Sequence, residues 1–162
     1  MADLKNISIR RARDNDAAGL IDLIGTIFKD YENCILDLAD LDKELLTIDT
    51  AMRAQGGKFW MATFENRIVG SIGYGLKGDF VELKRLYVAK DCRGTGLASK
   101  LAGLVYNAAG NVGAGAIELW SDTRFIEAHA FYLKHGFEKQ PETRDLHDLS
   151  NSSEYHFIKK LM

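Results

Sequence analysis

The hydrophobic pattern along the chain predicts alternating strands and helices. Ile7 and Ile9 alternate with polar residues, as in a strand that buries one face. The apolar positions that follow recur every three or four residues instead. They predict a helix whose buried face carries Ala17, Leu20, Ile21, Ile24 and Phe28. Asp14 or Asp16 precedes this helix and is expected to cap it.

A second helix is expected over residues 42–55, with Leu45, Ile48 and Met52 inward, ending at Gly56-Gly57. After residue 57 the apolar positions recur with a period of two, in short runs that turn residues separate. This pattern predicts a meander of three strands over residues 58–64, 67–76 and 80–88.

The second half of the chain alternates between strands and helices. The pattern predicts a helix from residue 97, a strand over 115–121, a helix over 124–135 and a strand over 154–161. The single proline, Pro141, is expected to mark a loop. Hairpins followed by strand–helix–strand–helix predict an α/β fold with a mixed sheet, in one domain over residues 1–162. A purely parallel sheet would lack the hairpins.

The third strand of the meander changes the parity of its apolar positions. Val81 and Leu83 share one parity, and Leu86 and Val88 have the other. A bulge of one residue near residues 84–85 would place all four on one side, and bulges often lie beside active sites. The alternative is a strand buried on both faces, where parity matters little.

A basic, glycine-containing loop joins this strand to an amphipathic helix. The loop reads Arg93-Gly94-Thr95-Gly96-Leu97-Ala98. A helix N-terminus carries free amides and the positive end of the dipole, and glycine lets a ligand approach the backbone. The loop therefore predicts a phosphate site, with an ordinary turn before a helix as the alternative.

The spacing within the loop excludes two common phosphate motifs. The order Ser99 then Lys100 after Gly96 does not supply a P-loop. A dinucleotide fingerprint requires a third glycine where Ser99 stands, and it requires the glycines directly after the strand.

Two stretches of the chain fit other motifs. Arg93-x-x-Gly96-x-Ala98 and Ala128-x-x-Phe131-Tyr132-x-x-x-Gly136-Phe137 match R/Q-x-x-G-x-G/A and A-x-x-F-Y-x-x-x-G-F. Residues 58–137 thereby resemble the GCN5-related N-acetyltransferases. The resemblance implies a mostly antiparallel, splayed central sheet flanked by helices. It also implies direct transfer of an acetyl group from acetyl-CoA to a primary amine, without a metal.

The resemblance implies a role for each matching residue. The backbone of 94–98 would hold the pyrophosphate, and the Val88 N–H would polarise the thioester carbonyl. Tyr132 would protonate the departing thiolate, with a packed core aromatic as the alternative. Glu82 would be the base that deprotonates the amine. The alternatives are that Glu82 is only a solvated charge on the strand, or that a water molecule accepts the proton. The expected cofactor-binding residues are Leu86, Tyr87, Val88, Arg93, Gly94, Thr95, Gly96, Leu97, Ala98 and Phe125.

The sequence departs from the family pattern at two site positions. Trp120 stands where other members carry a carboxylate base, although Glu118 and Asp122 are near. Phe125 stands where many members carry an asparagine that contacts the pantetheine arm. A polar contact at that position is therefore not expected here.

Composition and charge limit the remaining possibilities. The net charge of −2 does not steer the chain to nucleic acid or to acidic membranes, and neither is expected as a partner. Cys34 and Cys92 are expected to be free thiols in a reducing cytoplasm, with a disulfide as the alternative. The first ten residues lack the apolar segment of a secretory signal, which agrees with a cytoplasmic location. No Cys/His cluster has metal-ligand spacing.

The acceptor is not identified by a motif. It is expected to be a primary amine on a small molecule or peptide. Acidic residues between the first helix and the start of the second favour a cationic acceptor or form a solvated face: Asp30, Glu32, Asp37, Asp40, Asp42 and Glu44. A catalytically inactive CoA-binding sensor and an NAD- or ATP-binding module are the alternatives to an enzyme. The transferred acyl group and a homodimeric state are left open.

Overall fold

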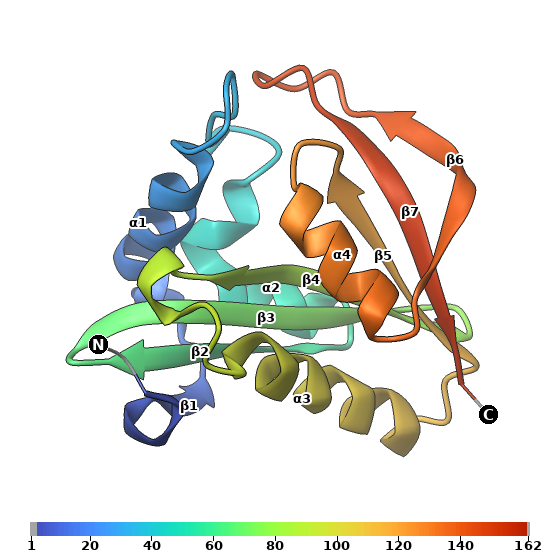
Figure 1. The fold of residues 1–162 in the computed structure, drawn as a ribbon, viewed down its shortest axis with the longest axis horizontal. Helices are drawn as coiled ribbons and strands as arrows, with labels where there is room; N and C mark the ends of the chain where they lie inside the picture. The colour runs from blue at the N-terminus through green and yellow to red at the C-terminus, as the bar shows by residue number, and fades with distance from the viewer. Residues whose placement is uncertain (1–2, 162) are drawn as a thin grey trace.

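The computed structural model describes residues 3–161, which form four α-helices and seven strands (Figure 1). The helices are α1 (Ala17–Phe28), α2 (Ile48–Ala54), α3 (Leu97–Asn111) and α4 (Ile126–Lys134). The strands are β1 (Ser8–Arg11), β2 (Lys58–Phe64), β3 (Arg67–Lys77), β4 (Phe80–Val88), β5 (Ala116–Asp122), β6 (Glu138–Asp145) and β7 (Ser153–Lys160).

The seven strands make one sheet that opens in the middle. The strand order is β1-β2-β3-β4-β5-β7-β6, and every neighbouring pair except β4–β5 is antiparallel. The parallel β4–β5 pairing joins only 80–82 to 116–118. Beyond it, β4 and β5 run apart, as the two fans of strands in Figure 1 show. The mixed, splayed sheet expected from the sequence is confirmed.

The predicted bulge in β4 is also confirmed. Gly73 pairs with Lys84, whereas Ser71 pairs with Tyr87, so Arg85 and Leu86 together face one residue of β3. Arg85 takes a positive φ of 55°, a conformation that costs a non-glycine residue free energy. The bulge turns the end of β4 away from β5 and contributes to the opening in the sheet.

Two hydrophobic clusters cover the two faces of the sheet. On one face, α3 packs against the inward residues of β4, β5 and β7, which include Val81, Leu83, Ile117, Leu119 and Phe157. On the other face, α1 and α2 pack against Phe59 and Met61 of β2. Since side chains alternate along a strand, Glu82, Lys84, Glu118 and Trp120 point to the face opposite α3.

The second predicted helix is interrupted. A 3-10 segment, Lys43–Thr47, precedes α2, and Thr47 leaves helical geometry with a ψ of 55°. Leu45, Ile48 and Met52 are nevertheless fully buried, as expected. Asp16 stands at the N-cap of α1, as one of the two expected candidates, but its side chain makes no cap bond to the helix. Asp14 instead accepts hydrogen bonds from the amide and hydroxyl of Thr50 in α2.

Pro141 was expected to mark a loop, and this expectation is wrong because residues 138–145 around it are extended. They form β6, an edge strand that pairs with β7. The sequence EKQPETRD has no apolar alternation, because the strand is largely exposed. Pro141, which lacks an N–H, falls where the register shifts between Lys139 and Thr143.

Both cysteines are free thiols, as expected: Cys92 is buried and Cys34 is partly exposed. Among residues 3–161, no helix combines the length and the apolar character needed to span a bilayer.

Candidate active site

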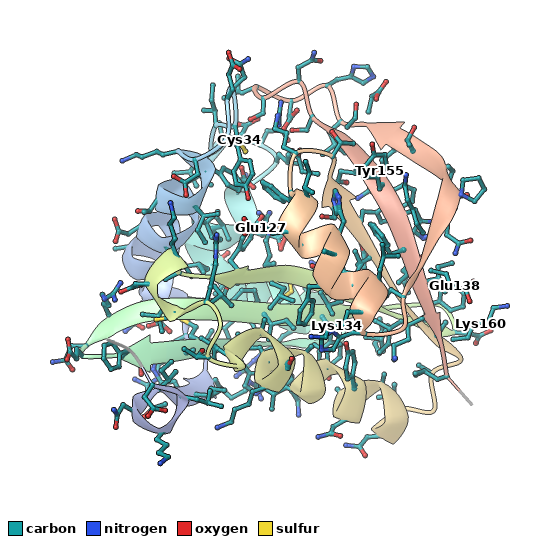
Figure 2. All side chains as sticks on the ribbon, in the orientation of Figure 1. Cys34, Glu127, Lys134, Glu138, Tyr155 and Lys160 are labelled. Carbon is teal, nitrogen blue, oxygen red and sulfur yellow. The ribbon has the colours of Figure 1, made fainter. Side chains whose placement is uncertain are left out.

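The opening between β4 and β5 forms a cavity of about 490 Å³. One wall is β4, from Glu82 at the seam to Leu86, Tyr87 and Val88 at the end of the strand. The opposite wall comes from β5, α4 and the C-terminal strands. Cys34, on the loop after α1, and Glu127, on α4, lie on this cavity and are labelled in Figure 2. The cavity thus lies where the sheet opens, next to the glycine loop.

Among residues 3–161, the backbone N–H of Val88 has no strand partner and is free to bind a ligand. Ala89 N donates to Val69 O at 2.8 Å, so the Gly70–Val88 pair is of the non-hydrogen-bonded kind. The N–H and C=O of Val88 therefore point away from β3, toward the opening. The C=O accepts from Nε of Arg93 at 3.2 Å, which agrees with this direction.

The glycine loop leaves a row of free amides at the start of α3. Gly94 and Gly96 take φ values of 76° and 90°, which favour glycine. The Thr95 hydroxyl donates to Cys92 O at 2.7 Å and accepts from Leu97 N at 3.3 Å, fixing the loop. Within residues 3–161, the amides of Gly94, Thr95, Gly96 and Ala98 have no acceptor. These amides fit an anion such as a pyrophosphate.

The neighbouring side chains of the loop divide between core and cavity. Leu97 is 1% exposed and belongs to the α3 core, so only its backbone faces the loop. Ala98 and Arg93 line the cavity. Arg93 also pairs with Glu127 of α4 at 3.2 Å, which joins the loop to the opposite wall.

Aromatic side chains form one end of the cavity. The ring of Phe125 lies 4.9 Å from Tyr31, 5.9 Å from Phe28 and 6.2 Å from Tyr87, measured between centroids. All four line the cavity. Burial raises the pKa of Tyr87 well above its ordinary range, and the nearby charge of Arg85 only partly opposes this. The end is therefore apolar, as Phe125 in place of asparagine led us to expect.

Tyr132 lies on α4 and is 5% exposed, yet it lines the cavity. Its ring packs against Phe137 at 5.6 Å and Phe157 at 5.7 Å between centroids. Tyr132 is therefore both a packed aromatic and a residue that lines the cavity, so it agrees with both interpretations of the sequence. Burial raises the pKa of Tyr132 well above its ordinary range, so the phenol stays protonated at neutral pH.

Glu82 lines the cavity beside the seam of the sheet, in register with Glu118 of β5. No ion pair forms with Glu82 among residues 3–161. Glu118, by contrast, is buried with Lys77 at 2.8 Å and His156 at 3.1 Å. Burial raises the pKa of Glu118, but the hydrogen bonds from Lys77 and His156 outweigh it and lower that pKa. Of these two carboxylates, Glu82 is the one free to exchange a proton with a ligand.

Comparison with known proteins decides the family. A model of the acetyltransferase (GNAT) family matches residues 22–137. The chain belongs to this family. Its members use acetyl-CoA and act on amines.

Two curated relatives are similar to this GNAT protein over part of its length. N-acetylaspartate synthetase of Danio rerio is 30% identical over 119 residues, or 71% of this chain and 40% of that protein. An uncharacterized N-acetyltransferase of Escherichia coli K12, YjgM, is 33% identical over 87 residues, 51% of this chain and 52% of that protein. The chain thus spans about half or less of the relatives' own lengths.

Solved GNAT structures match the fold over nearly the whole chain. An acetyltransferase from Staphylococcus aureus Mu50 has a TM-score of 0.82 at 26% identity, covering 96% of this chain and 99% of that one. An acetyltransferase from Streptococcus agalactiae has a TM-score of 0.83 at 22% identity, covering 98% and 100%. PaiA N-acetyltransferase from Thermoplasma acidophilum, solved with coenzyme A, has a TM-score of 0.73 at 18% identity, covering 96% and 99%.

The acidic residues of the GNAT chain near the cavity are partly neutralised. Asp42 and Glu44 line it, but both pair with the bulge residue Arg85, at 2.7 and 3.4 Å. Arg85 also donates to Leu41 O at 3.3 Å. The bulge is thereby tied to the segment before α2, and the acidic wall considered from the sequence is offset by a buried cation.

The C-terminal strands add cavity residues that the sequence reasoning missed. Arg144 of β6 and Glu154 of β7 line the cavity beside Trp120 of β5. Arg144 could not be recognised, because β6 was not expected to be a strand. Alternation of Glu154 with Tyr155 and Phe157 in the expected last strand would have placed Glu154 on the face opposite α3. Within the part of the chain that the structure describes, no three His, Cys, Asp or Glu side chains are arranged to hold a metal ion.

Proposed function

We propose that this protein transfers an acetyl group from acetyl-CoA to a primary amine of a small molecule or peptide, by direct attack. The observation that carries the proposal is the alignment of free backbone donors along one side of the cavity, in the loop before α3 and at Val88. Tyr132 and Glu82 line the same cavity. Acetyl-CoA supplies the activated thioester, and the chain binds, orients and exchanges protons.

The glycine loop would hold the diphosphate of the cofactor. The free amides of Gly94, Thr95, Gly96 and Ala98 can each donate to a phosphate oxygen, and the dipole of α3 favours the negative charge. Arg93 adds a positive charge at the same end of the cavity. Such charge-assisted hydrogen bonds are about twice as strong as neutral ones.

The end of β4 would bind the pantetheine arm. An extended arm beside 86–88 can pair with the outward N–H of Val88 as an added strand does. The Val88 N–H is then placed to donate to the thioester carbonyl oxygen, where negative charge develops during attack. The rings of Tyr87 and Phe125 supply the apolar surface next to that arm.

Two side chains would move the protons. Glu82 accepts the proton of the amine, directly or through a water molecule, and Tyr132 donates a proton to the thiolate that leaves. The raised pKa of Tyr132 keeps the donor protonated over the neutral range. Attack forms the N–C bond of the amide, breaks the C–S bond of the thioester and leaves free CoA.

The test is release of free thiol from acetyl-CoA with a panel of amines. Tyr132→Phe is expected to lower kcat by about 10²-fold, within the usual range for loss of a general acid. Its affinity for acetyl-CoA should stay unchanged. Tyr155→Phe is the matched control, because Tyr155 lies on β7 and contacts His129 instead of the cavity.

Two results would count against the proposal. An unchanged kcat in Tyr132→Phe at every pH would remove Tyr132 from the reaction. Tight binding of acetyl-CoA with no thiol release for any amine would favour a CoA-binding sensor. We also propose one domain over residues 1–162 and a cytoplasmic location, supported by the continuous sheet and by the two free thiols.

A further inference from the structure

The arginines around the cavity differ in how many of their donors are occupied. Arg85 and Arg124 each use both Nη atoms on carboxylate, hydroxyl or carbonyl oxygens of the protein. Arg93 uses Nε and one Nη. Arg144 uses only Nε, which donates to Glu154 at 2.8 Å. Within residues 3–161, both Nη atoms of Arg144 therefore have no acceptor.

The guanidinium of Arg144 is held in place by its surroundings. Its Cζ lies over the ring of Trp120, 4.2 Å from the ring centroid, a cation–π contact that holds the group there. Trp120 is itself stacked on His156 at 4.2 Å and 8°. His156 is fixed by hydrogen bonds to Glu118 and Glu142. The side chain of Arg144 is 42% exposed and lines the cavity, so a ligand can reach its free donors.

We propose that Arg144 binds the carboxylate of the acceptor, and that the acceptor is a free amino acid. A guanidinium with two free Nη groups matches a carboxylate in two parallel hydrogen bonds. Lys84 lines the same cavity and has no carboxylate within 4.0 Å among residues 3–161. Glu154 offsets part of the charge of Arg144. Lys84 supplies a second positive charge, so the carboxylate of the acceptor still meets a net positive site.

The spacing suits a small acceptor. Glu82 is in register with Glu118, and Trp120 lies two residues further along β5 on the same face. Two residues of a strand span about 7 Å. Glu82 and the Trp120 ring under Arg144 are thus about 7 Å apart along the strands, a span that a free amino acid can bridge with one hydrogen bond at each end. A diamine of the same length would bring its second cation against Arg144 and Lys84.

The inference rests on the proposed acetyl transfer, and its test compares acceptors that differ only in the carboxylate. The twenty standard amino acids and β-alanine are screened by thiol release, together with the matching amides and with putrescine as a diamine. The wild-type protein should prefer acids over their amides by at least about tenfold in kcat/KM. Arg144→Gln should reduce that ratio by about 10- to 100-fold, mainly through KM, as for loss of hydrogen bonds to a charged group.

Two further variants complete the design. Arg144→Lys should restore part of the preference, since it keeps the charge and loses the fork. Lys139→Gln is the matched control: it removes one positive charge from the same strand, where Lys139 lies over Tyr155 away from the cavity. It should leave the ratio unchanged. Thermal melting confirms that each variant is folded.

The outcomes separate the two proposals. Preference of the wild-type protein for amides or for putrescine would overturn the carboxylate site and leave acetyl transfer intact. The same holds if Arg144→Gln keeps the acid preference. Absence of thiol release with every acceptor would instead overturn acetyl transfer and, with it, this inference.

Discussion

Replacing Gly96 by alanine tests the phosphate site with two separate measurements. Gly96 has a φ of 90°, and an added Cβ would meet only Leu4 Cδ2 at 3.7 Å, an ordinary contact. The protein thus has room for the methyl group, and the cost in stability comes from the backbone conformation. Left-handed geometry costs an L-residue about 1–2 kcal/mol. For a chain of this length, that lowers Tm by roughly 2–8 °C.

The effect on acetyl-CoA affinity has a different origin. The methyl group would occupy space beside the free amides of Gly94, Gly96 and Ala98, where the diphosphate is proposed to lie. Weakening one charge-assisted hydrogen bond costs about 1.5–3 kcal/mol. We therefore expect the Kd of acetyl-CoA to rise by roughly 10- to 100-fold.

Gly113→Ala is the matched control. Gly113 has a φ of 71° with open space around its Cβ, and it lies after the other end of α3. Thermal melting should show similar losses of stability for the two variants. Calorimetry with acetyl-CoA should show weaker binding only for Gly96→Ala. Equal Kd values in Gly96→Ala and the wild-type protein would refute the assignment of this loop.

Three other changes have expected outcomes. Ser150→Ala should cost about 1–3 kcal/mol in urea unfolding and speed hydrogen exchange at Ile35, because the Ser150 hydroxyl bonds both Ile35 N, at 2.7 Å, and Ile35 O, at 3.0 Å. Asp16→Asn should destabilise the protein at pH 7 and much less at pH 2–3. The hydrogen bond from Arg10 lowers the pKa of the Asp16 carboxyl. The stability that this carboxylate contributes is therefore present above about pH 4 and is lost as the pH falls through the lowered pKa. Glu82→Gln should lower kcat by about 10²-fold in the thiol-release assay with the KM for acetyl-CoA unchanged.

Each of these expectations can be contradicted directly. Unchanged exchange at Ile35 would show that the contact with Ser150 does not hold the loop after α1. A penalty for Asp16→Asn that is the same at both pH values would exclude a contribution from its charge. A full kcat in Glu82→Gln would leave water as the proton acceptor.

The sequence predicted the strands and helices whose own side chains show a regular hydrophobic pattern. The strands over 58–64 and 80–88 match β2 and β4 at both ends, since apolar alternation and turn residues define them. The bulge was predicted because Val81 and Leu86 differ in parity and both pack in or against one core. The free amides before α3 lie at the helix N-terminus that the glycines predicted, and the phosphate site itself stays a prediction.

The parts that were missed depend on contacts distant in sequence. The polar strand β6 has no pattern of its own and is held by its pairing with β7. Arg85 could be located in the bulge, but its pairing with Asp42 depends on a chain segment more than 40 residues away. The stack of Arg144 on Trp120 joins two strands that have no direct pairing with each other, so neither residue alone indicated it.

The short β4–β5 seam has a mechanical consequence. Three residues on each strand connect the two halves of the sheet, and past that point the halves hold together through side chains and loops. A molecule bound between the two halves would keep them apart and fix the angle between them, because it would contact both halves and hydrogen-bond to the edge of β4. Amide exchange along Leu86–Val88 and Leu119–Asp122 should then slow on ligand binding more than anywhere in the hairpin of β2 and β3.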